Sequence, residues 1–416
     1  MEEILMGILS RLPVKSVVRF NCVSKFWNAL MSQPYFTKIH LNHAKNQTSS
    51  QKLLSLHCHP KDADDNRLYF YSSSLSLVQL VKDYRIVDCP PNSNPSYGAL
   101  IYCSCDGLFL IGIWNERYVE QPSVLLIWNP STRESLLLPH SKYYSSSDSK
   151  YYSSSDYDDS SDYEDGDDND LRSTYGLAYD SISDDYKVFR LVLPFHGQNE
   201  NEIFALKKGS WRIIDETSSS GMTDCSMYSG GEFLPFVYGA FHWLGISSKK
   251  LYVVSFNISS EVYGEISLPE IVCFLAISKW SKHKIEVDVG VSVLGGMLSF
   301  YYKDEKSFNL WMMKDGPGSW MKLFTIPSNK IYRVIPTYMF SDDQVLLCFK
   351  LDSKTMSRFV YRLISFGSFG LSNHIWPLDC DDIDIDAITI DKDIGIVYNG
   401  IVYTESLISP ELGLGV

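Results

Sequence analysis

An interval of about fifty residues separates six places in this chain where a short apolar strand ends, in most cases at a proline. The six stretches are Ile86–Pro90, Leu136–Pro139, Ile213–Asp215, Ile266–Pro269, Phe324–Pro327 and Ile375–Pro377. Their ends lie 49, 76, 54, 58 and 50 residues apart, and leaving out a low-complexity insert at 141–170 reduces the 76 to 46. Such an interval, with about four strands in each, is typical of propeller blades. The sequence therefore predicts a large all-β domain over 52–407, a kelch-like β-propeller of six or seven blades.

Two kinds of hairpin recur within this domain. The first places Asn after an apolar strand, as in Trp128–Thr132 and Phe256–Ser260, and suits a type I turn. The second, Gly-Ser-Trp at 209–211 and 318–320, leads into a strand that begins with Trp. The last strands, 395–398 and 401–404, are predicted to complete a blade that begins near residue 52, which would close the ring and remove exposed strand edges.

The first 45 residues have the pattern of short helices instead. Apolar residues recur there at spacings of three and four, namely Ile4, Leu5, Ile8, Leu9 and Leu12. This pattern predicts an amphipathic helix over 2–11, which Pro13 ends. A second helix should begin near Val14, and Ser24 can cap a third, in which Phe26 and Trp27 face inward. Three short helices make a poor core of their own, so we expect this unit to dock on another protein.

Charge is distributed unevenly along the chain. The total is −13, whereas residues 1–45 carry +4 and the insert at 141–170 carries −8. A basic N-terminal unit suits an acidic protein partner, and the acidic remainder argues against nucleic acid. The insert repeats an eight-residue Ser/Tyr/Asp unit and has too few aliphatic residues to form a core, so it is predicted to be a disordered surface loop. Its serines, which precede acidic residues, are candidate phosphorylation sites.

The chemistry-bearing residues do not form a recognisable catalytic or metal-binding pattern. The nine cysteines are odd in number and scattered, which favours free thiols in the cytoplasm, or also the nucleus. His57-Cys58-His59 lacks a second ligand cluster, and the acidic residues at 379–386 lack the glycine of a calcium loop. No apolar run is long enough to span a membrane, and residues 1–12 lack the features of a signal peptide. We therefore expect neither a metal nor another cofactor, and no catalytic activity.

Several segments resemble the plant F-box proteins. In the N-terminal unit these are Ile8–Phe20, Cys22–Lys25 with Trp27, Pro34–Phe36 and His40–Asn42. Further along, the segments similar to the F-box-associated β-propeller domain are Leu126–Arg133, Gly176–Asp180, Asp185–Val188 and Gly239–Leu244. The ending Ile401–Leu407 is similar to that of S-locus F-box proteins. Many relatives carry Leu-Pro at the front of the first helix, where Met1 stands here, so either this subgroup lacks the pair or translation begins upstream.

The resemblance implies a domain order and a function. Residues 1–45 would be the F-box, which binds the SKP adaptor of a cullin-based (SCF) ubiquitin ligase and through it the cullin and RING subunits. The residues expected to bind the adaptor are Ile4, Ile8, Leu9, Leu12, Pro13, Val14, Lys15, Val17, Arg19, Val23, Lys25 and Trp27. The propeller would bind a protein target for ubiquitination, a basic one and in the finer expectation a ribonuclease in pollen self-incompatibility. The alternatives are a propeller enzyme, or an adaptor-bound scaffold that degrades nothing.

Overall fold

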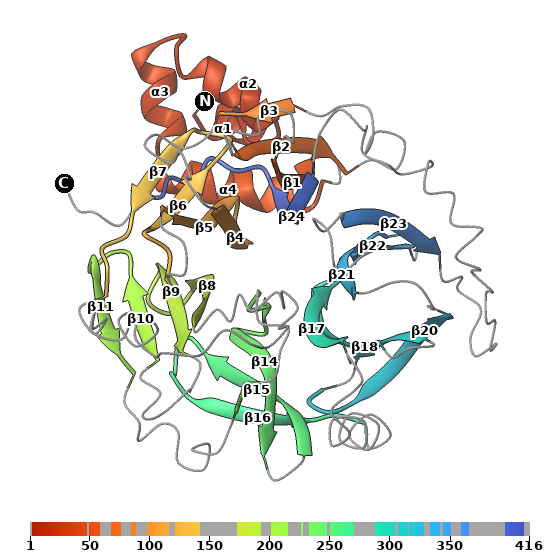
Figure 1. Cartoon of the computed structure of the whole chain (residues 1–416). Helices are drawn as coiled ribbons and strands as arrows, with labels where there is room; N and C mark the ends of the chain where they lie inside the picture. The colour runs from red at the N-terminus through yellow and green to blue at the C-terminus, as the bar shows by residue number, and fades with distance from the viewer. Residues whose placement is uncertain are drawn as a thin grey trace, which may run out of the picture.

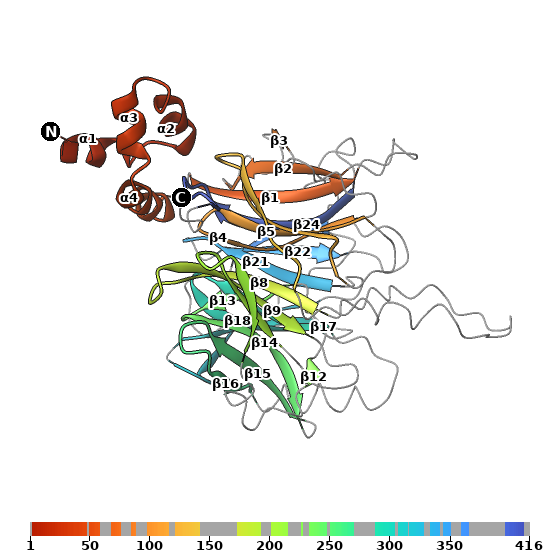
Figure 2. The same cartoon turned by 90° about the vertical axis from the view of Figure 1, so that its left-hand side faces the viewer.

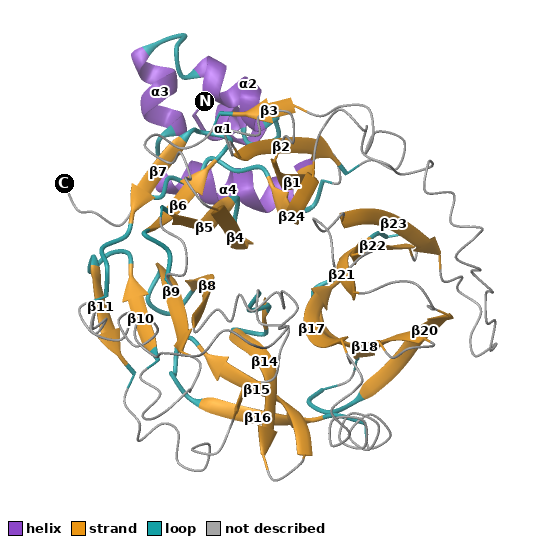
Figure 3. Cartoon of the chain, in the orientation of Figure 1, coloured by secondary structure: helices purple, strands orange, loops and turns teal. Residues whose placement is uncertain are grey.

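Four helices come first in the computed structural model and the strands follow (Figures 1 and 3). The structure describes residues 2–47, 50–58, 68–75, 85–88, 98–115, 121–141, 173–192, 201–214, 226–227, 233–247, 250–269, 288–303, 307–314, 316–327, 333–341, 344–350, 359–365 and 396–411. No helix within these ranges is long and apolar enough to cross a bilayer. Most of the insert, residues 142–170, lies outside the described residues, as do the Asp-rich segment at 379–386 and His59.

The helical unit contains one helix more than the three that the sequence predicts. The helices are α1 (Glu2–Leu9), α2 (Val14–Phe20), α3 (Lys25–Met31) and α4 (Pro34–Lys45). The predicted cap of α3 is confirmed, since the Ser24 hydroxyl accepts a hydrogen bond from the backbone N–H of Trp27 at 3.2 Å. The fourth helix escaped the apolar pattern because its buried face mixes polar with apolar side chains. These are Phe36, Thr37, His40, Leu41 and Ala44.

Within the described ranges, the strands form six antiparallel sheets arranged around a ring (Figure 1). Sheet 1 holds β1 (Gln51–Cys58), β2 (Leu68–Ser74), β3 (Arg85–Val87) and β24 (Ile396–Thr404). Sheet 2 holds β4 (Gly98–Cys105), β5 (Leu108–Trp114), β6 (Val124–Asn129) and β7 (Glu134–Leu137). Sheet 3 holds β8 (Ser173–Asp180), β9 (Asp185–Val192), β10 (Glu202–Ala205) and β11 (Ser210–Ile213).

The second half of the ring repeats this plan. Sheet 4 holds β12 (Ser226–Met227), β13 (Phe236–Val237), β14 (Ala240–Ser247), β15 (Lys250–Asn257) and β16 (Tyr263–Ser267). Sheet 5 holds β17 (Asp288–Leu294), β18 (Met297–Lys303), β19 (Ser307–Met313) and β20 (Trp320–Pro327). Sheet 6 holds β21 (Arg333–Met339), β22 (Gln344–Lys350) and β23 (Phe359–Ser365).

The number of complete blades differs from the predicted six or seven. Five sheets have the four or more strands of a complete blade, whereas sheet 6 has three among the described residues. The strand predicted to end at 375–377 falls in 366–395, which lies outside the described residues. The tail strands predicted at 395–398 and 401–404 are one strand, β24, and it joins sheet 1, the blade that the sequence predicts it to complete.

The predicted ring closure is confirmed. Strand β24 pairs antiparallel with β1 over nearly its whole length, from Gln51 opposite Thr404 to Cys58 opposite Ile396. Apolar side chains fill the space between neighbouring sheets. Between sheets 3 and 4, for example, the ring of Phe189 stacks on those of Phe241 and Phe256, with centroids 5.4 and 4.6 Å apart. Among the residues that the structure describes, six apolar clusters, each shared by two neighbouring sheets, join the sheets around the ring.

The Gly-Ser-Trp repeat corresponds to a repeated contact between sheets. Trp211 is the second residue of β11. Its indole N–H donates a hydrogen bond to the carbonyl of Pro139 at 2.6 Å. Trp320 makes the equivalent bond to the carbonyl of Ser267 at 2.8 Å. Pro139 lies two residues beyond β7 and Ser267 is the last residue of β16, and both strands are outer strands of the preceding sheet. The recurring Trp therefore ties the outer edge of one blade to the next.

The helical unit lies at one face of the ring, beside sheets 1 and 2 (Figures 1 and 2). Figure 2 shows that α4 is nearest to the ring, while α1, α2 and α3 stand farther out. A small core of their own holds the helices together, built from Leu9, Val17, Leu30, Met31 and Phe36. This arrangement leaves the outer surface of α1–α3 free of the ring.

Candidate docking surface of the N-terminal helices

Helix α1 divides the predicted apolar stripe between its two sides. Leu9 is buried, and Leu5 and Leu12 pack partly buried against the same core. Ile4 and Ile8 point elsewhere, and 68% and 57% of their surfaces are exposed. Both pairs, 4 with 8 and 5 with 9, are separated by one helical turn, so each lines one face. The inner face holds the unit together and the outer face offers two isoleucines to a partner.

Three of the residues expected to bind the adaptor are buried within the helical unit instead. Leu9, Val14 and Val17 are each at most 3% exposed, so they support the surface and do not form it. The short α2 buries Val14 and Val17 because they lie three residues apart on its inner face. Their place among the adaptor-binding residues stays a prediction, in which they would act by holding the exposed side chains in position.

The other nine predicted residues remain accessible to different degrees. Leu12 and Trp27 are half-buried, and the indole of Trp27 meets the Phe20 ring edge-on at 5.3 Å. The exposed ones are Ile4, Ile8, Pro13, Lys15, Arg19, Val23 and Lys25. Sequence reasoning missed two exposed aromatic side chains, Phe26 and Tyr35, which are 48% and 64% exposed. Phe26 was expected to face inward beside Trp27, but adjacent residues of a helix point in different directions.

Helix α4 is the element that fastens the unit to the ring. Leu41 belongs to the apolar core between sheets 2 and 3. The Lys38 ammonium lies 2.7 Å from the carboxylate of Asp184 in the β8–β9 turn, and that of Lys45 lies 2.6 Å from Asp106 in the β4–β5 turn. Two of the six basic side chains of residues 1–45 are thus paired with the ring.

His40 joins α4 to the turn between α1 and α2. Its Nε2–H donates to the carbonyl oxygen of Leu12 at 2.9 Å, and the side chain is almost fully buried. Burial lowers the pKa of His40, so the imidazole is neutral near pH 7. A neutral ring with one N–H suits this single acceptor, and the bond holds α4 in register with the helices that carry the exposed surface.

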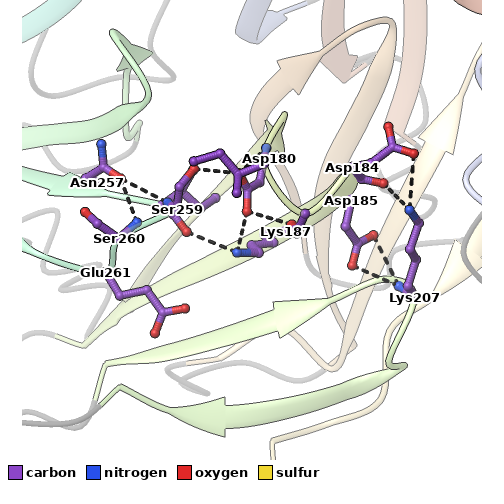
Figure 4. A network of polar contacts seen from close by, with 12 residues as sticks. Asp180, Asp184, Asp185, Lys187, Lys207, Asn257, Ser259, Ser260 and Glu261 are labelled. Carbon is purple, nitrogen blue, oxygen red and sulfur yellow. Dashed lines mark hydrogen bonds and ion pairs between the residues drawn. The ribbon is translucent and has the colours of Figure 1, made fainter.

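The ring face below α4 carries a network of polar contacts between sheets 3 and 4 (Figure 4). Lys187 lies 2.7 Å from the Asp180 carboxylate and donates to the carbonyl of Ile258 at 3.1 Å. The Ser259 hydroxyl donates to the same Asp180 carboxylate at 2.5 Å. Burial alone would raise the pKa of Asp180, but the hydrogen bonds from Lys187, Ser183 and Ser259 outweigh it and hold that pKa below its usual value.

Asp184 links this network to the helices. The carboxylate accepts hydrogen bonds from the Lys38 ammonium and the Tyr179 hydroxyl, which lower its pKa well below the usual range. Lys207 lies beside the same carboxylate, and its backbone N–H donates to Asp185 at 3.2 Å (Figure 4). Because these charges are paired with one another, the network fixes the geometry of the turns and leaves little unpaired charge for a ligand.

A shallow pocket of about 400 Å³ lies on the same face, where the inner strands end. Its walls come from the turns at Asp106–Gly107 and Gly295–Gly296 and from the ends of β21 and β24. The carboxylate of Asp106 that lines it is engaged by Lys45 and by the Tyr186 hydroxyl, at 2.6 and 3.0 Å. The pocket therefore offers a potential ligand mainly backbone and small polar groups.

The remaining chemical candidates of the sequence have structural roles where the structure describes them. His57 is buried, with Nε2 2.6 Å from the Ser55 hydroxyl and its ring against that of Tyr71. Burial raises the pKa of the Cys103 thiol to about 12, and the thiol accepts a hydrogen bond from the backbone N–H of Leu177 at 3.0 Å. A thiol with this pKa is protonated at pH 7 and unreactive. His242 is packed inside sheet 4.

Comparison with known proteins agrees with this two-part architecture. Residues 2–39 match the F-box domain, and residues 63–368 match the F-box associated beta propeller domain. The chain therefore belongs to the F-box proteins that carry an F-box-associated β-propeller. In Arabidopsis thaliana, F-box protein CPR1 is 28% identical over 392 residues, which cover 85% of this chain and 83% of that protein. An F-box/kelch-repeat protein of the same plant is 27% identical over 341 residues, covering 78% and 79%.

Similarity to solved structures is far weaker. The crystal structure of TolB from Acinetobacter baumannii aligns with 80% of this chain and 70% of its own, at 7% identity and a TM-score of 0.41. A value this low adds nothing to the assignment of function. The kelch-like character of the ring and the likeness to S-locus F-box proteins stay predictions.

Proposed function

We propose that this chain is the substrate-recognition subunit of an SCF-type ubiquitin ligase. In this proposal the helices of residues 1–45 dock a SKP adaptor, which links the chain to the cullin and RING subunits, and the ring of 52–407 binds the protein target. The observation that carries the proposal is the outer face of α1. Ile4 and Ile8 are more than half exposed there, although the helix has a well-packed inner face. Exposed isoleucines one turn apart are a feature that a partner protein would bury.

The arrangement of α4 supports an external partner for this surface. If the helices used α1 to dock on their own ring, Ile4 and Ile8 would be covered. The ring instead holds α4, through Leu41, Lys38 and Lys45. The four other basic side chains, of Arg11, Lys15, Arg19 and Lys25, are exposed around the outer helices. Basic groups around an apolar surface would steer an acidic adaptor toward it.

The ring contributes proximity in this proposal and makes no bond itself. A receptor raises the effective concentration of a target lysine near the ubiquitin-charged enzyme. The competing hypothesis of a propeller enzyme requires several converging polar ligands or carboxylates. Within the described ranges no group of three His, Cys, Asp or Glu side chains is placed to hold a metal ion. Metal analysis of the purified protein would separate the two hypotheses, since a stoichiometric bound metal would favour the enzyme.

The net charge of the chain suggests what kind of target the ring binds. Outside the basic N-terminal unit the chain is strongly acidic, and that charge suits a basic target. A secreted-type ribonuclease, as in pollen self-incompatibility, is the finer proposal, and it rests on the S-locus likeness of Ile401–Leu407. Proximity labelling with and without an intact α1 surface would identify the target. A target that accumulates when the gene is lost would support degradation over a scaffold role.

A single substitution on α1 tests the docking proposal. Ile4→Glu places a charge on the exposed face while an acidic residue in the first helical turn remains compatible with the helix. Leu12 is less suitable, because it packs against the core of the unit. We expect the wild-type chain to co-purify with a SKP adaptor and Ile4→Glu to lose the adaptor. The matched control is Ile86→Glu on edge strand β3, since Ile86 is 64% exposed. Adaptor binding that survives Ile4→Glu unchanged would refute docking through α1.

A further inference from the structure

The segment that follows β24 contacts both the ring and the helical unit. It comprises Glu405, Ser406, Leu407 and Ile408, which directly follow the ring-closing strand. Ser406 and Ile408 are buried against the ring, and Ile408 belongs to the same core as Leu41 of α4. Leu407 packs instead against the core of the helical unit. One short stretch therefore contacts the ring through Ser406 and Ile408 and the helical unit through Leu407.

The ring side of this segment is held by directional bonds. The Asn129 amide donates to the carbonyls of Ser406 and Ile408, at 3.1 and 2.7 Å. The Ser406 hydroxyl donates to the carbonyl of Asp106 at 2.5 Å. The Lys52 ammonium lies 2.5 Å from the Glu405 carboxylate. These contacts anchor the segment to sheets 1 and 2 and fix the direction in which Leu407 projects.

A glycine makes the close approach possible. Gly107 of the β4–β5 turn has φ +81°, and a Cβ added there would lie 2.5 Å from the Ser406 hydroxyl oxygen and 2.8 Å from the carbonyl of Thr404. Only glycine accepts both the backbone conformation and the contact. The Asp106-Gly107 turn is therefore shaped to receive the segment after β24.

The core of the helical unit is small, so an additional packing contact would stabilise it. Its core contains five buried apolar residues from fewer than fifty residues of chain, and units of this size are marginal without additional stabilisation. Leu407, from the opposite end of the chain, adds a side chain to that core. The residue can reach the helices only when β24 occupies its place beside β1, because β24 leads directly into the segment.

We propose that residues 405–408 form a clasp that makes adaptor docking by the helical unit depend on closure of the ring. This inference rests on the proposed adaptor docking of α1–α3. The N-terminal helices of an incompletely synthesised or opened chain lack Leu407 and are loosely packed, so they present Ile4 and Ile8 poorly. A closed ring completes the helical core and brings the docking surface to full affinity. The clasp thereby restricts assembly with the adaptor to chains whose ring has formed.

Two measurements on the full chain test the clasp. Hydrogen exchange of the α1–α3 peptides is measured without adaptor, and adaptor affinity is measured separately with a purified SKP protein. We expect Leu407→Ala to speed exchange of these peptides about tenfold and to weaken adaptor affinity by a similar factor, with ring peptides nearly unchanged. Leu407→Val should give a smaller effect of the same kind, which preserves the test if the alanine variant folds poorly.

The matched control is Leu323→Ala in sheet 5, a half-buried leucine that packs against ring residues remote from the helices. It should speed exchange in sheet 5 and leave the helices and adaptor affinity unchanged. Equal effects of Leu407→Ala and Leu323→Ala on the helices, or no effect of Leu407→Ala, would overturn the clasp. Looser helices with unchanged adaptor affinity would also overturn it. A wild-type chain that ignores the adaptor would refute the proposed function, and the exchange data would still show whether Leu407 supports the helices.

Discussion

The exposed isoleucines of α1 allow the adaptor affinity of a variant to be calculated in advance. The perturbation is the double substitution Ile4→Ala with Ile8→Ala. Full burial of an isoleucine side chain stabilises by about 1.5–3 kcal/mol. The exposed fractions of 68% and 57% limit what a partner can still bury, which leaves about 1–2 kcal/mol for Ile4 and about 0.9–1.7 kcal/mol for Ile8. Together they account for about 1.9–3.7 kcal/mol, or ~25- to 500-fold in Kd.

Alanine should remove most of this contribution without harming the helix. Both positions face solvent in the free chain, and alanine has a higher helix propensity than isoleucine. Isothermal titration of the full chain with a SKP adaptor measures the loss, and thermal unfolding shows that the fold is intact. Ile86→Ala, which removes the same side chain at 64% exposure on β3, is the control and should leave Kd unchanged.

The size and the location of the effect decide the outcome. A loss below about threefold in the double variant would mean that the adaptor does not bury the outer face of α1, and the reasoning would fail. An equal loss in Ile86→Ala would point to a surface on the ring. A large loss accompanied by lower thermal stability would contradict the claim that these residues face solvent in the free chain.

Three further predictions concern the contact between α4 and the ring, the loss of stability at acidic pH, and the reactivity of the cysteines. Leu41→Ala should destabilise the chain by about 2–4 kcal/mol, since the side chain is buried between α4 and the ring; denaturant unfolding measures this, and a change below about 1 kcal/mol would contradict the packing. The pKa values of Asp180 and Asp184 are lowered by folding, so their contribution is complete above about pH 4 and is lost as pH falls through the folded pKa values. Thermal unfolding from pH 7 to pH 2 should therefore show a fall below about pH 4 that is shallower in Asp180→Asn, and an identical profile would refute the assignment. Maleimide should label exposed Cys22 well before Cys103 in the native chain. Mass spectrometry of the labelled peptides measures the order, and earlier labelling of Cys103 would contradict its assignment as an unreactive thiol.

Much of the ring could be predicted because its repeated hairpins depend on contacts between residues close in sequence. The Asn of each Asn hairpin uses its side chain in the same way, since Asn129 accepts from the backbone N–H of Ser131 and Asn257 from that of Ser259, at 2.8 and 3.0 Å. The interval between strand ends then follows from four strands and their turns. Blade number was harder, because the spacing of strand ends does not show how many strands each sheet receives, and sheet 6 has three among the described residues.

The docking surface was predicted less completely, and the reason is geometric. A spacing of three or four residues shows that side chains share one broad side of a helix, but it does not tell a buried edge from an exposed one. Leu9 and Ile8 are neighbours in the same pattern, yet one is 3% and the other 57% exposed. The ion pairs of Lys38 and Lys45 could not be predicted, because the carboxylates that these lysines of α4 meet, Asp184 and Asp106, are distant in sequence.

Closure of the ring by β24 also affects how several copies of this chain behave together. The partner of β24 is an edge of β1, and the same edge is presented by every other copy. During refolding at high concentration, β24 of one molecule can insert beside β1 of another, which yields interlinked dimers by strand exchange. In such dimers the tail of one polypeptide would complete the helical core of its neighbour, so dilute refolding should favour independent molecules.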